Sequence, residues 1–128
     1  MSTLAQKLAI KDERSVGLLE TKPHDDFIDL GTVLGGVRLA KAWTEADVVL
    51  WPASTEAEIR QGMASGGDDL AKAAAVWVCY KKGNAVEINR EKLWIILEDY
   101  SWKAVSQVSL DDTWSALRVR PMSEEERG

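Results

Sequence analysis

Two short runs that are apolar on both faces constrain the fold of this chain more than any other feature. They cover residues 46–51 and 73–80, and only Asp47 interrupts them. Strands that bury both faces are typical of a parallel sheet covered by helices. We therefore expect two parallel strands here, with a helix between them.

A capping box indicates where that helix begins. Thr55 is followed three residues later by Glu58, and such a pair satisfies two backbone N–H groups that the first helical turn leaves without partners. Ile59 opens an apolar stripe at helical spacing. The pair Gly66 and Gly67 is expected to end the helix.

Weaker patterns predict the remaining elements. They are strands over 15–20, 37–40, 104–110 and 115–120, a short helix over about 27–34, and a helix capped by Asn89 that carries Leu93, Ile96, Leu97 and Tyr100. The short turn Asp111-Asp112-Thr113 joins the last two strands, so we expect these two to pair antiparallel.

This order of elements predicts an α/β fold, specifically a three-layer, Rossmann-like sandwich. Its sheet is expected to be mostly parallel and to end in a C-terminal antiparallel hairpin. A chain of 128 residues has the size of one domain, which we place over 1–121. Residues 122–128 are acidic and are expected to form a flexible tail.

The C-terminal stretch Val-Ser-Leu-Asp-Asp-Thr-Trp-Ser-Ala-Leu-Arg, at 108–118, resembles the signature of a small, uncharacterised bacterial family. The resemblance extends from about Ala5 to Arg120 and implies no assigned activity. Members commonly carry a proline before two lysines, where this chain has Tyr80-Lys81-Lys82. The strand sequence also resembles the sheet of an S-adenosylmethionine-dependent methyltransferase, whose sheet ends in a similar hairpin, and this likeness concerns the fold alone.

Charge and cysteine content narrow the classes of function. The chain has 16 Lys and Arg against 21 Asp and Glu, for a net charge of −5, which argues against a nucleic-acid partner. The single cysteine, Cys79, allows no internal disulfide, and one cysteine with one histidine excludes a Cys/His zinc site. No apolar run is long enough to span a bilayer, and no secretory signal is visible. We expect a soluble cytoplasmic protein, a monomer or homodimer, without a membrane partner.

No cofactor is expected, because the loop after the first strand lacks the required pattern. A dinucleotide loop needs spaced glycines that let backbone N–H groups approach a pyrophosphate. Residues 21–26 contain no glycine and include the carboxylates Asp25 and Asp26. Aspartate pairs can share a magnesium ion, but capping and turn roles account for Asp25-Asp26 and Asp111-Asp112 better, so no metal is expected. Cys79 is expected to be a small buried hydrophobe.

A ligand site, if present, is expected where the parallel strands end, because ligands of open α/β sheets bind beyond the carboxyl ends of the strands. Ser54 and Thr55 open a helix there, whose N–H groups can receive an anion. The alternative is that the charged loops only pair with each other. Trp114 is either a platform for a ligand or oligomer contact, or is covered by a helix. The residues expected at this edge are Lys22, His24, Pro52, Ser54, Lys81, Lys82, Asp111, Asp112, Thr113 and Trp114.

The sequence assigns no catalytic residue and points to no reaction. The leading hypothesis is a small binding or regulatory module, not an enzyme, that presents these loops to a small molecule or a protein. The alternative is a degenerate S-adenosylmethionine-dependent methyltransferase-like or nucleotide-binding protein.

Overall fold

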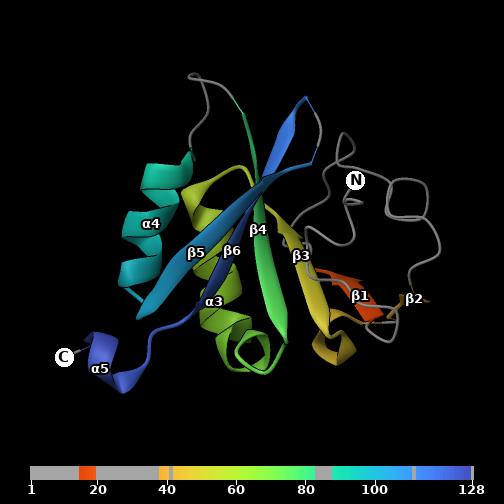
Figure 1. The fold of residues 1–128 in the computed structure, drawn as a ribbon, viewed down its shortest axis with the longest axis horizontal. Coiled ribbons are helices and arrows are strands. Elements are labelled where there is room, and N and C mark those ends of the chain that lie inside the picture. The colour runs from red at the N-terminus through yellow and green to blue at the C-terminus, as the bar shows by residue number, and fades with distance from the viewer. Residues whose placement is uncertain (1–14, 20–37, 41, 83–87, 111, 128) are drawn as a thin grey trace.

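A six-stranded mixed sheet forms the centre of the computed structural model, which describes residues 15–19, 38–40, 42–82, 88–110 and 112–127. The strands follow one another across the sheet in the order β2-β1-β3-β4-β6-β5 (Figure 1). Their bounds are β1 Ser15–Leu18, β2 Arg38–Leu39, β3 Val48–Pro52, β4 Ala75–Lys81, β5 Trp102–Ser109 and β6 Trp114–Pro121. The expected helix over 27–34 lies outside the described residues.

The sheet is less parallel than expected. β2, β1, β3 and β4 run parallel, whereas β6 pairs antiparallel with both β4 and β5. The antiparallel pairings are longer than the parallel ones, so the expectation of a mostly parallel sheet is wrong. The physical reason is that β6 inserts between β4 and β5, so the short hairpin turn that makes β5 and β6 antiparallel also places an antiparallel strand against β4.

Strand direction nevertheless brings the ends of several strands to one edge. Because β6 is antiparallel to both of its neighbours, β5 points in the same direction as β4. The carboxyl ends of β1, β3, β4 and β5 therefore lie at the same edge of the sheet. The amino ends of these strands, together with the end of β6, lie at the opposite edge.

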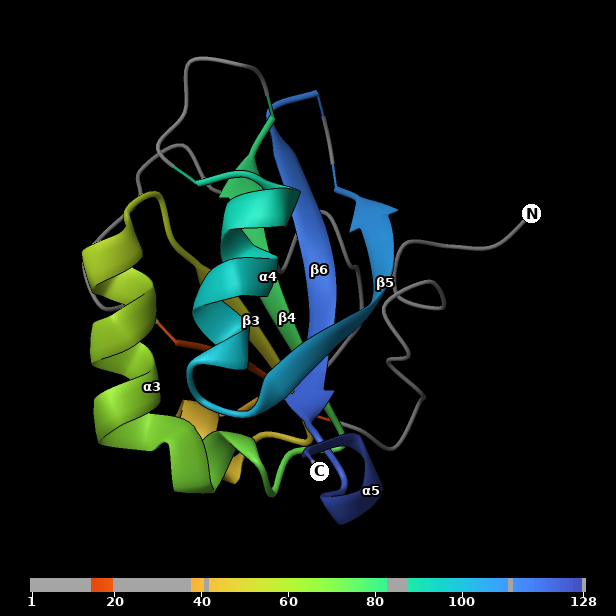
Figure 2. The same cartoon turned by 90° about the vertical axis from the view of Figure 1, so that its left-hand side faces the viewer.

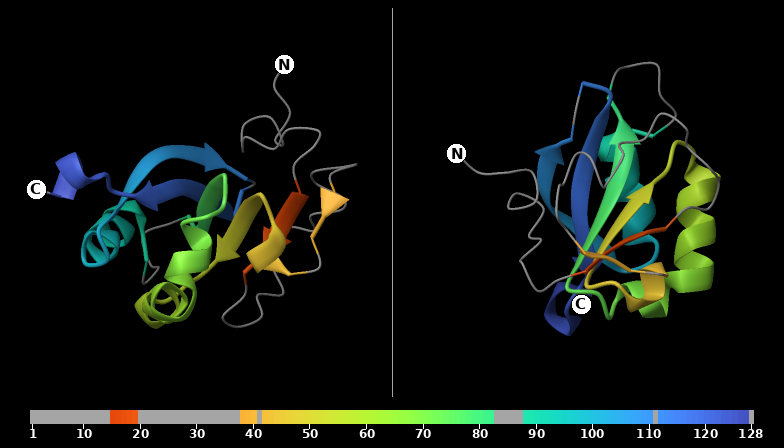
Figure 3. Two further views of the ribbon diagram at one scale, coloured as in Figure 1. Left: turned by 90° about the horizontal axis from the view of Figure 1, so that it is seen from below. Right: turned by 90° about the vertical axis from the view of Figure 1, so that its right-hand side faces the viewer.

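Two helices, α3 (Glu56–Leu70) and α4 (Arg90–Glu98), cover the same face of the sheet. Figures 2 and 3 show both on one side of the strands. Their apolar residues, including Ile59 and Leu93, share one buried cluster with Val49, Trp51 and Val78 from the strands. A second helical layer, as a three-layer sandwich requires, is not found within the described ranges.

Both predicted helix starts are confirmed. The Thr55 hydroxyl accepts a hydrogen bond from the Glu58 amide, and the Asn89 side chain accepts one from the Lys92 amide. Asparagine and threonine at these positions satisfy amide groups that have no partner within the helix.

The predicted end of the first helix is wrong, because α3 continues through Gly66 and Gly67 to Leu70. A Cβ atom at Gly66 would lie 2.7 Å from the Trp43 ring, and one at Gly62 only 2.1 Å from the Trp51 ring. Gly66 is therefore needed for close packing against an indole and does not terminate the helix.

The opposite face of the sheet carries a second buried cluster. It contains two tryptophans, Trp77 and Trp114, packed with Val16, Leu50 and Cys79. Trp114 is fully buried, which excludes the first of its two alternatives, an exposed platform for a ligand or oligomer contact.

The acidic C-terminal segment was expected to form a flexible tail. The structure shows a single helical turn in it, α5 (Glu124–Arg127). Glutamates at the start of the turn and an arginine at its end match the direction of the helix dipole. The backbone before it is tied back to the domain, since the Met122 amide donates to the Ser101 carbonyl at 2.8 Å.

Candidate functional site

The predicted site residues after β3, β4 and β5 do lie at one edge of the sheet, which we call the carboxyl edge. The Ala53 amide, after β3, donates to the Cys79 carbonyl in β4 at 2.9 Å. The Lys82 amide, after β4, donates to the Thr113 carbonyl at 2.8 Å. Three further predicted residues, Lys22, His24 and Asp111, lie outside the described residues, as do Asp25 and Asp26.

The anion site expected at the start of α3 is already filled by a side chain of the protein. The Glu58 carboxylate, which is only 5% exposed, accepts hydrogen bonds from the Ser54 amide at 3.2 Å, the Ser54 hydroxyl at 3.1 Å and the Thr55 hydroxyl at 3.3 Å. A second anion at this helix start would meet a negative charge that is already there. Ser54 is therefore a capping residue first, and its expected role towards an external anion is not supported.

The two lysines at this edge have different surroundings. The Lys81 ammonium lies 5.6 Å from the centre of the buried Trp114 ring, within the range of a cation–π interaction. Lys82 is exposed, and its ammonium donates to the Ser109 hydroxyl at 2.6 Å. Asp112 is exposed and forms no ion pair with any described residue. Among the described contacts, Lys81 thus meets an indole and Lys82 a hydroxyl, and the alternative of a pair with Asp111 lies outside the described residues.

Two buried groups near the ends of β3 and β4 are structural. Cys79 is fully buried, burial raises the pKa of its thiol, and its Sγ donates to the Trp77 carbonyl at 3.6 Å. The neutral thiol confirms the expectation of a small buried hydrophobe. The Trp51 indole N–H is the only buried side-chain polar atom without a hydrogen-bond partner in the described part of the chain.

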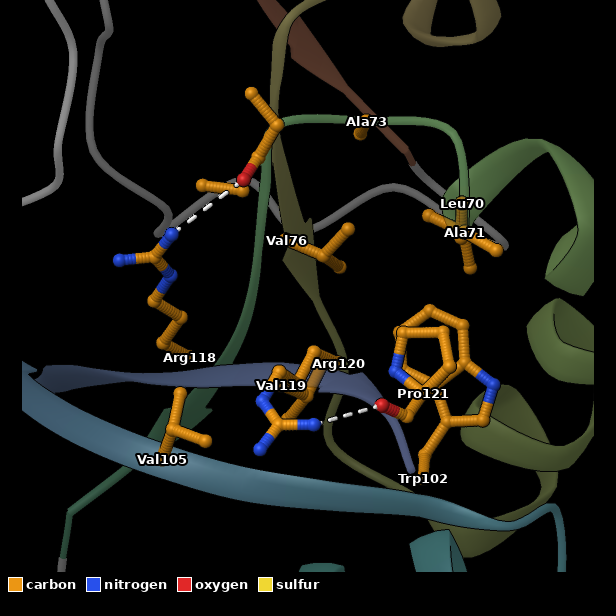
Figure 4. Close-up of a pocket in the computed structure, with 12 residues that line it drawn as sticks. Leu70, Ala71, Ala73, Val76, Trp102, Val105, Arg118, Val119, Arg120 and Pro121 are labelled. Atoms are coloured by element: carbon orange, nitrogen blue, oxygen red, sulfur yellow. Dashed lines mark hydrogen bonds between the residues drawn. The ribbon is translucent and has the colours of Figure 1, made fainter. Parts of the chain in front are cut away.

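A pocket that the sequence did not indicate opens at the opposite end of the sheet, which we call the amino edge. It has a volume of about 300 Å³ and lies between the connection from α3 to β4 and the far end of the hairpin formed by β5 and β6 (Figure 4). It is lined by Leu70, Ala71, Ala73, Ala74, Ala75, Val76, Trp102, Val105, Arg118, Val119, Arg120 and Pro121.

One sequence signal could have found this pocket. Arg118 and Arg120 alternate with Leu117 and Val119 along the last strand, a pattern typical of a strand with one solvated face. In the structure Arg118 is half-buried and Arg120 exposed, and both line the pocket. The alanine-rich segment before β4 gives no comparable signal, because small apolar side chains are equally common in closed cores.

Comparisons with known proteins bear on the fold. No protein-family model matches the sequence, and no curated protein does. The Bacillus subtilis tRNA methyltransferase TrmK is similar in structure, with a TM-score of 0.52 and 11% identity over 98% of this chain and 72% of the other. An uncharacterised Listeria monocytogenes protein has a TM-score of 0.52 and 13% identity, over 97% of this chain and 69% of its own. A Streptococcus agalactiae protein of the NAD-binding Rossmann superfamily has a TM-score of 0.50 and 15% identity, over 95% of this chain and 69% of its own. The chain has a Rossmann-like fold.

In other similar structures, this chain matches a smaller share of the other protein. The chain spans 40% and 47% of two structures of a candidate tRNA methyltransferase from Streptococcus pneumoniae, at a TM-score of 0.44. The resemblance of residues 108–118 to an uncharacterised bacterial family finds no support in these comparisons and stays a prediction. No helix in the described ranges is long and apolar enough to cross a membrane.

These comparisons correct two expectations. The expectation of a binding or regulatory module is wrong, and the methyltransferase-like alternative is favoured, because the tRNA methyltransferase TrmK is similar in fold. The exclusion of nucleic acid is also wrong, because a tRNA methyltransferase shares this Rossmann-like fold. Net charge describes the whole surface and does not reveal local basic regions such as the one at Arg118 and Arg120.

Proposed function

We propose that this chain is a methyltransferase-type domain that binds S-adenosylmethionine beyond the carboxyl ends of β1 and β3. The observation that carries the proposal is the order of the sheet, in which the antiparallel strand β6 lies between β4 and β5 and the remaining strands point one way. The overall similarity to TrmK supports it. Ligands of such sheets bind at the carboxyl ends of the strands.

The groups at the end of β3 fit one part of this cofactor and not another. S-adenosylmethionine carries an electrophilic methyl group on a cationic sulfur, next to an adenosine and an amino-acid carboxylate. The half-buried hydroxyls of Ser54 and Thr55 are suited to hydrogen bonds with ribose hydroxyls, and the Glu58 carboxylate favours a cation over an anion. The cofactor's own carboxylate would be repelled at this place. We assign no residue to this carboxylate and no chemical step.

Binding of the cofactor is the direct test. Thermal unfolding of the full chain is measured with S-adenosylmethionine, S-adenosylhomocysteine, ATP and NAD. A ligand at 100 times its Kd stabilises the folded state by about 2.7 kcal/mol, which raises Tm by several degrees for a domain of this size. We expect the first two compounds to raise Tm and the last two to leave it unchanged.

A pair of serine variants locates the site. Ser54→Ala should weaken binding of S-adenosylhomocysteine in calorimetry about tenfold. Ser65→Ala is the matched control, because the Ser65 hydroxyl contacts only the Gln61 carbonyl on exposed α3 surface. No shift with either adenosyl compound, or a shift with NAD alone, contradicts the proposal. Transfer of a labelled methyl group to bulk tRNA then tests whether RNA is the acceptor.

A further inference from the structure

Trp94 differs from the other tryptophans of the chain in its exposure. Four of the six are at most 6% exposed and Trp43 is half-buried, whereas Trp94 on α4 is 44% exposed. Its indole N–H donates to the Glu98 carboxylate at 2.8 Å, one helical turn further on. This hydrogen bond holds the ring in one orientation. An indole that is fixed and partly open to solvent can receive a second planar group by stacking.

A slot of about 260 Å³ lies beside this ring, between α4 and β5 (Figure 2). Val105, which lines the slot together with Trp94, is also 44% exposed, so both apolar side chains are open to solvent. β5 is the outermost strand, and its pairing with β6 shifts register between Ala104 and Ser106, which leaves Val105 without a partner on β6. Bulges of this kind are frequent at sheet edges and next to functional sites. The remaining lining residues are Arg90, Ala104, Ser106, Gln107 and Leu117.

The polar side chains of the slot come from both elements. Arg90 is exposed one helical turn before Trp94, and its guanidinium donates to the Gln107 side-chain oxygen at 3.4 Å, a long hydrogen bond. Among the described residues Arg90 forms no ion pair, and no acidic residue lines the slot. Guanidinium groups bind phosphate oxygens more strongly than they bind a neutral amide. The Gln107 amide can donate as well as accept, as the edge of a nucleobase also does.

We propose that the slot binds one unpaired base of a single-stranded RNA segment, with the base stacked on Trp94, its edge at Gln107 and its phosphate at Arg90. Unpaired bases are recognised in this way, by stacking on aromatic rings and by hydrogen bonds to their edges. The volume of the slot suits one base, because pockets for whole drug-sized ligands begin at about 300 Å³. Glu98 lies one turn beyond Trp94 and repels phosphate, so the backbone of the strand passes on the Arg90 side.

This inference rests on the proposed function and adds a contact for its RNA acceptor. The carboxyl ends of β5 and β3 lie at the same edge, separated by β4 and β6, and three strand spacings amount to about 14 Å. α4 also begins at this edge, with Arg90 as its first residue (Figure 2). A strand held at Trp94 can therefore extend along the carboxyl edge to the proposed S-adenosylmethionine site without overlapping it.

A single stacked base is not enough for measurable binding. Stacking on an aromatic side chain contributes roughly 5- to 150-fold to affinity, whereas millimolar binding requires about a thousandfold relative to a molar standard state. A free mononucleotide should therefore bind too weakly to detect, which agrees with the unchanged Tm expected with ATP and NAD. A strand adds contacts through its neighbouring nucleotides.

Fluorescence anisotropy of the full chain with a labelled oligoadenylate of about ten nucleotides tests the inference. We expect this single strand to bind about tenfold more tightly than the same strand paired with oligouridylate, because the bases of a duplex are already stacked and cannot enter the slot. Unlabelled AMP at millimolar concentration should not displace the strand.

Variants on α4 then place the base. Trp94→Ala should weaken binding of the single strand at least about fivefold, whereas Trp94→Phe, which keeps a stacking ring but loses the bond to Glu98, should stay within about threefold of the parent. Ile95→Ala is the matched control, because Ile95 is 63% exposed on the same helix and does not line the slot. It should leave binding unchanged.

A charge-removing variant places the phosphate. Arg90→Gln should weaken binding about fivefold and lower the slope of its salt dependence by about one. Lys72→Gln removes the same charge from a side chain that is 80% exposed after the end of α3, and it should change neither quantity. All of these positions are exposed, so the variants should melt close to the parent, which separates lost binding from lost folding.

Four outcomes would overturn the inference: no binding of the single strand, equal binding of strand and duplex, displacement of the strand by AMP, or equal losses in Ile95→Ala and Trp94→Ala. The anisotropy measurements contain no cofactor, and the calorimetry with S-adenosylhomocysteine contains no RNA. Cofactor binding without strand binding would overturn this inference alone. Strand binding without cofactor binding would overturn the proposed methyltransferase function and leave the base-binding slot.

Discussion

The two ends of the sheet provide different partners for their polar residues. At the carboxyl edge, the polar groups that follow the strands bind to other side chains: Ser54 and Thr55 to Glu58, and Lys82 to Ser109. At the amino edge, Arg118 and Arg120 donate to backbone carbonyls beside a pocket. The end that looks rich in chemistry in the sequence thus uses its side chains to bind one another.

This difference follows from the needs of helices. The first turn of a helix leaves four amide groups without partners, and α3 begins at the carboxyl edge directly after β3. Serine, threonine and glutamate are therefore needed there to cap α3, whether or not a ligand binds. Neither α3 nor α4 begins at the amino edge, so the capping of these two helices does not account for its arginines.

The largest expected change in stability concerns the glycines that allow α3 to pack closely on β3. Gly62→Ala should lower the free energy of unfolding by about 2–3 kcal/mol, because the new methyl group would overlap the buried Trp51 ring and overpacking costs that much. Gly67→Ala is the matched control, since a Cβ atom there has no neighbour within 4 Å. It should stabilise by about 0.5–1 kcal/mol through helix propensity. Urea denaturation measures both, and equal stability of the two variants would refute this packing.

A smaller loss is expected at the cap of α3. Glu58→Ala should cost about 2 kcal/mol, because the half-buried Ser54 and Thr55 donors lose their acceptor. The control Glu56→Ala removes a partly exposed pair with Arg60 and should change stability by less than about 1 kcal/mol. If Glu58→Ala lowers the free energy of unfolding no more than Glu56→Ala does, the Ser54 and Thr55 donors do not depend on Glu58, and the comparison of the two edges fails.

The smallest expected effect is a loss of stability at alkaline pH, and it depends on Cys79 near the carboxyl edge. Burial raises the pKa of the Cys79 thiol above its ordinary value of about 9. Below pH 9 both states hold the proton and the stability is fully present. Above pH 9 the unfolded chain loses the proton while the folded chain keeps it, so the free energy of unfolding falls.

The matching measurement compares the parent with Cys79→Ala from pH 7 to 10. Over this range, the parent should lose about 1 kcal/mol more than the variant, since the slope per group is at most about 1.4 kcal/mol per pH unit. Tyr80, whose pKa burial also raises, contributes equally to both proteins. Parallel pH curves for parent and variant would indicate that the thiol is not desolvated.

Local sequence patterns predicted much of the fold and part of the site. The caps at Thr55 and Asn89 were found because capping depends on residues three positions apart. The turn between β5 and β6 was found because its shortness permits only an antiparallel pair. The grouping of Lys82 with Thr113 followed from strand direction. The capping role of Ser54 was missed, because the capping box predicts that Glu58 folds back to the Thr55 amide, whereas it accepts from the amide and hydroxyl of Ser54.

The sequence by itself determined which segments become strands and helices, because periodicity, capping and turn chemistry act over a few residues. Only the tertiary structure decided that Gly66 packs against Trp43, that Trp114 is buried, and that a pocket with two arginines opens where β6 ends. Each of these depends on residues from segments distant in the chain. Burial and charge at such places are set by what other elements bring to them, and no local pattern carries that information.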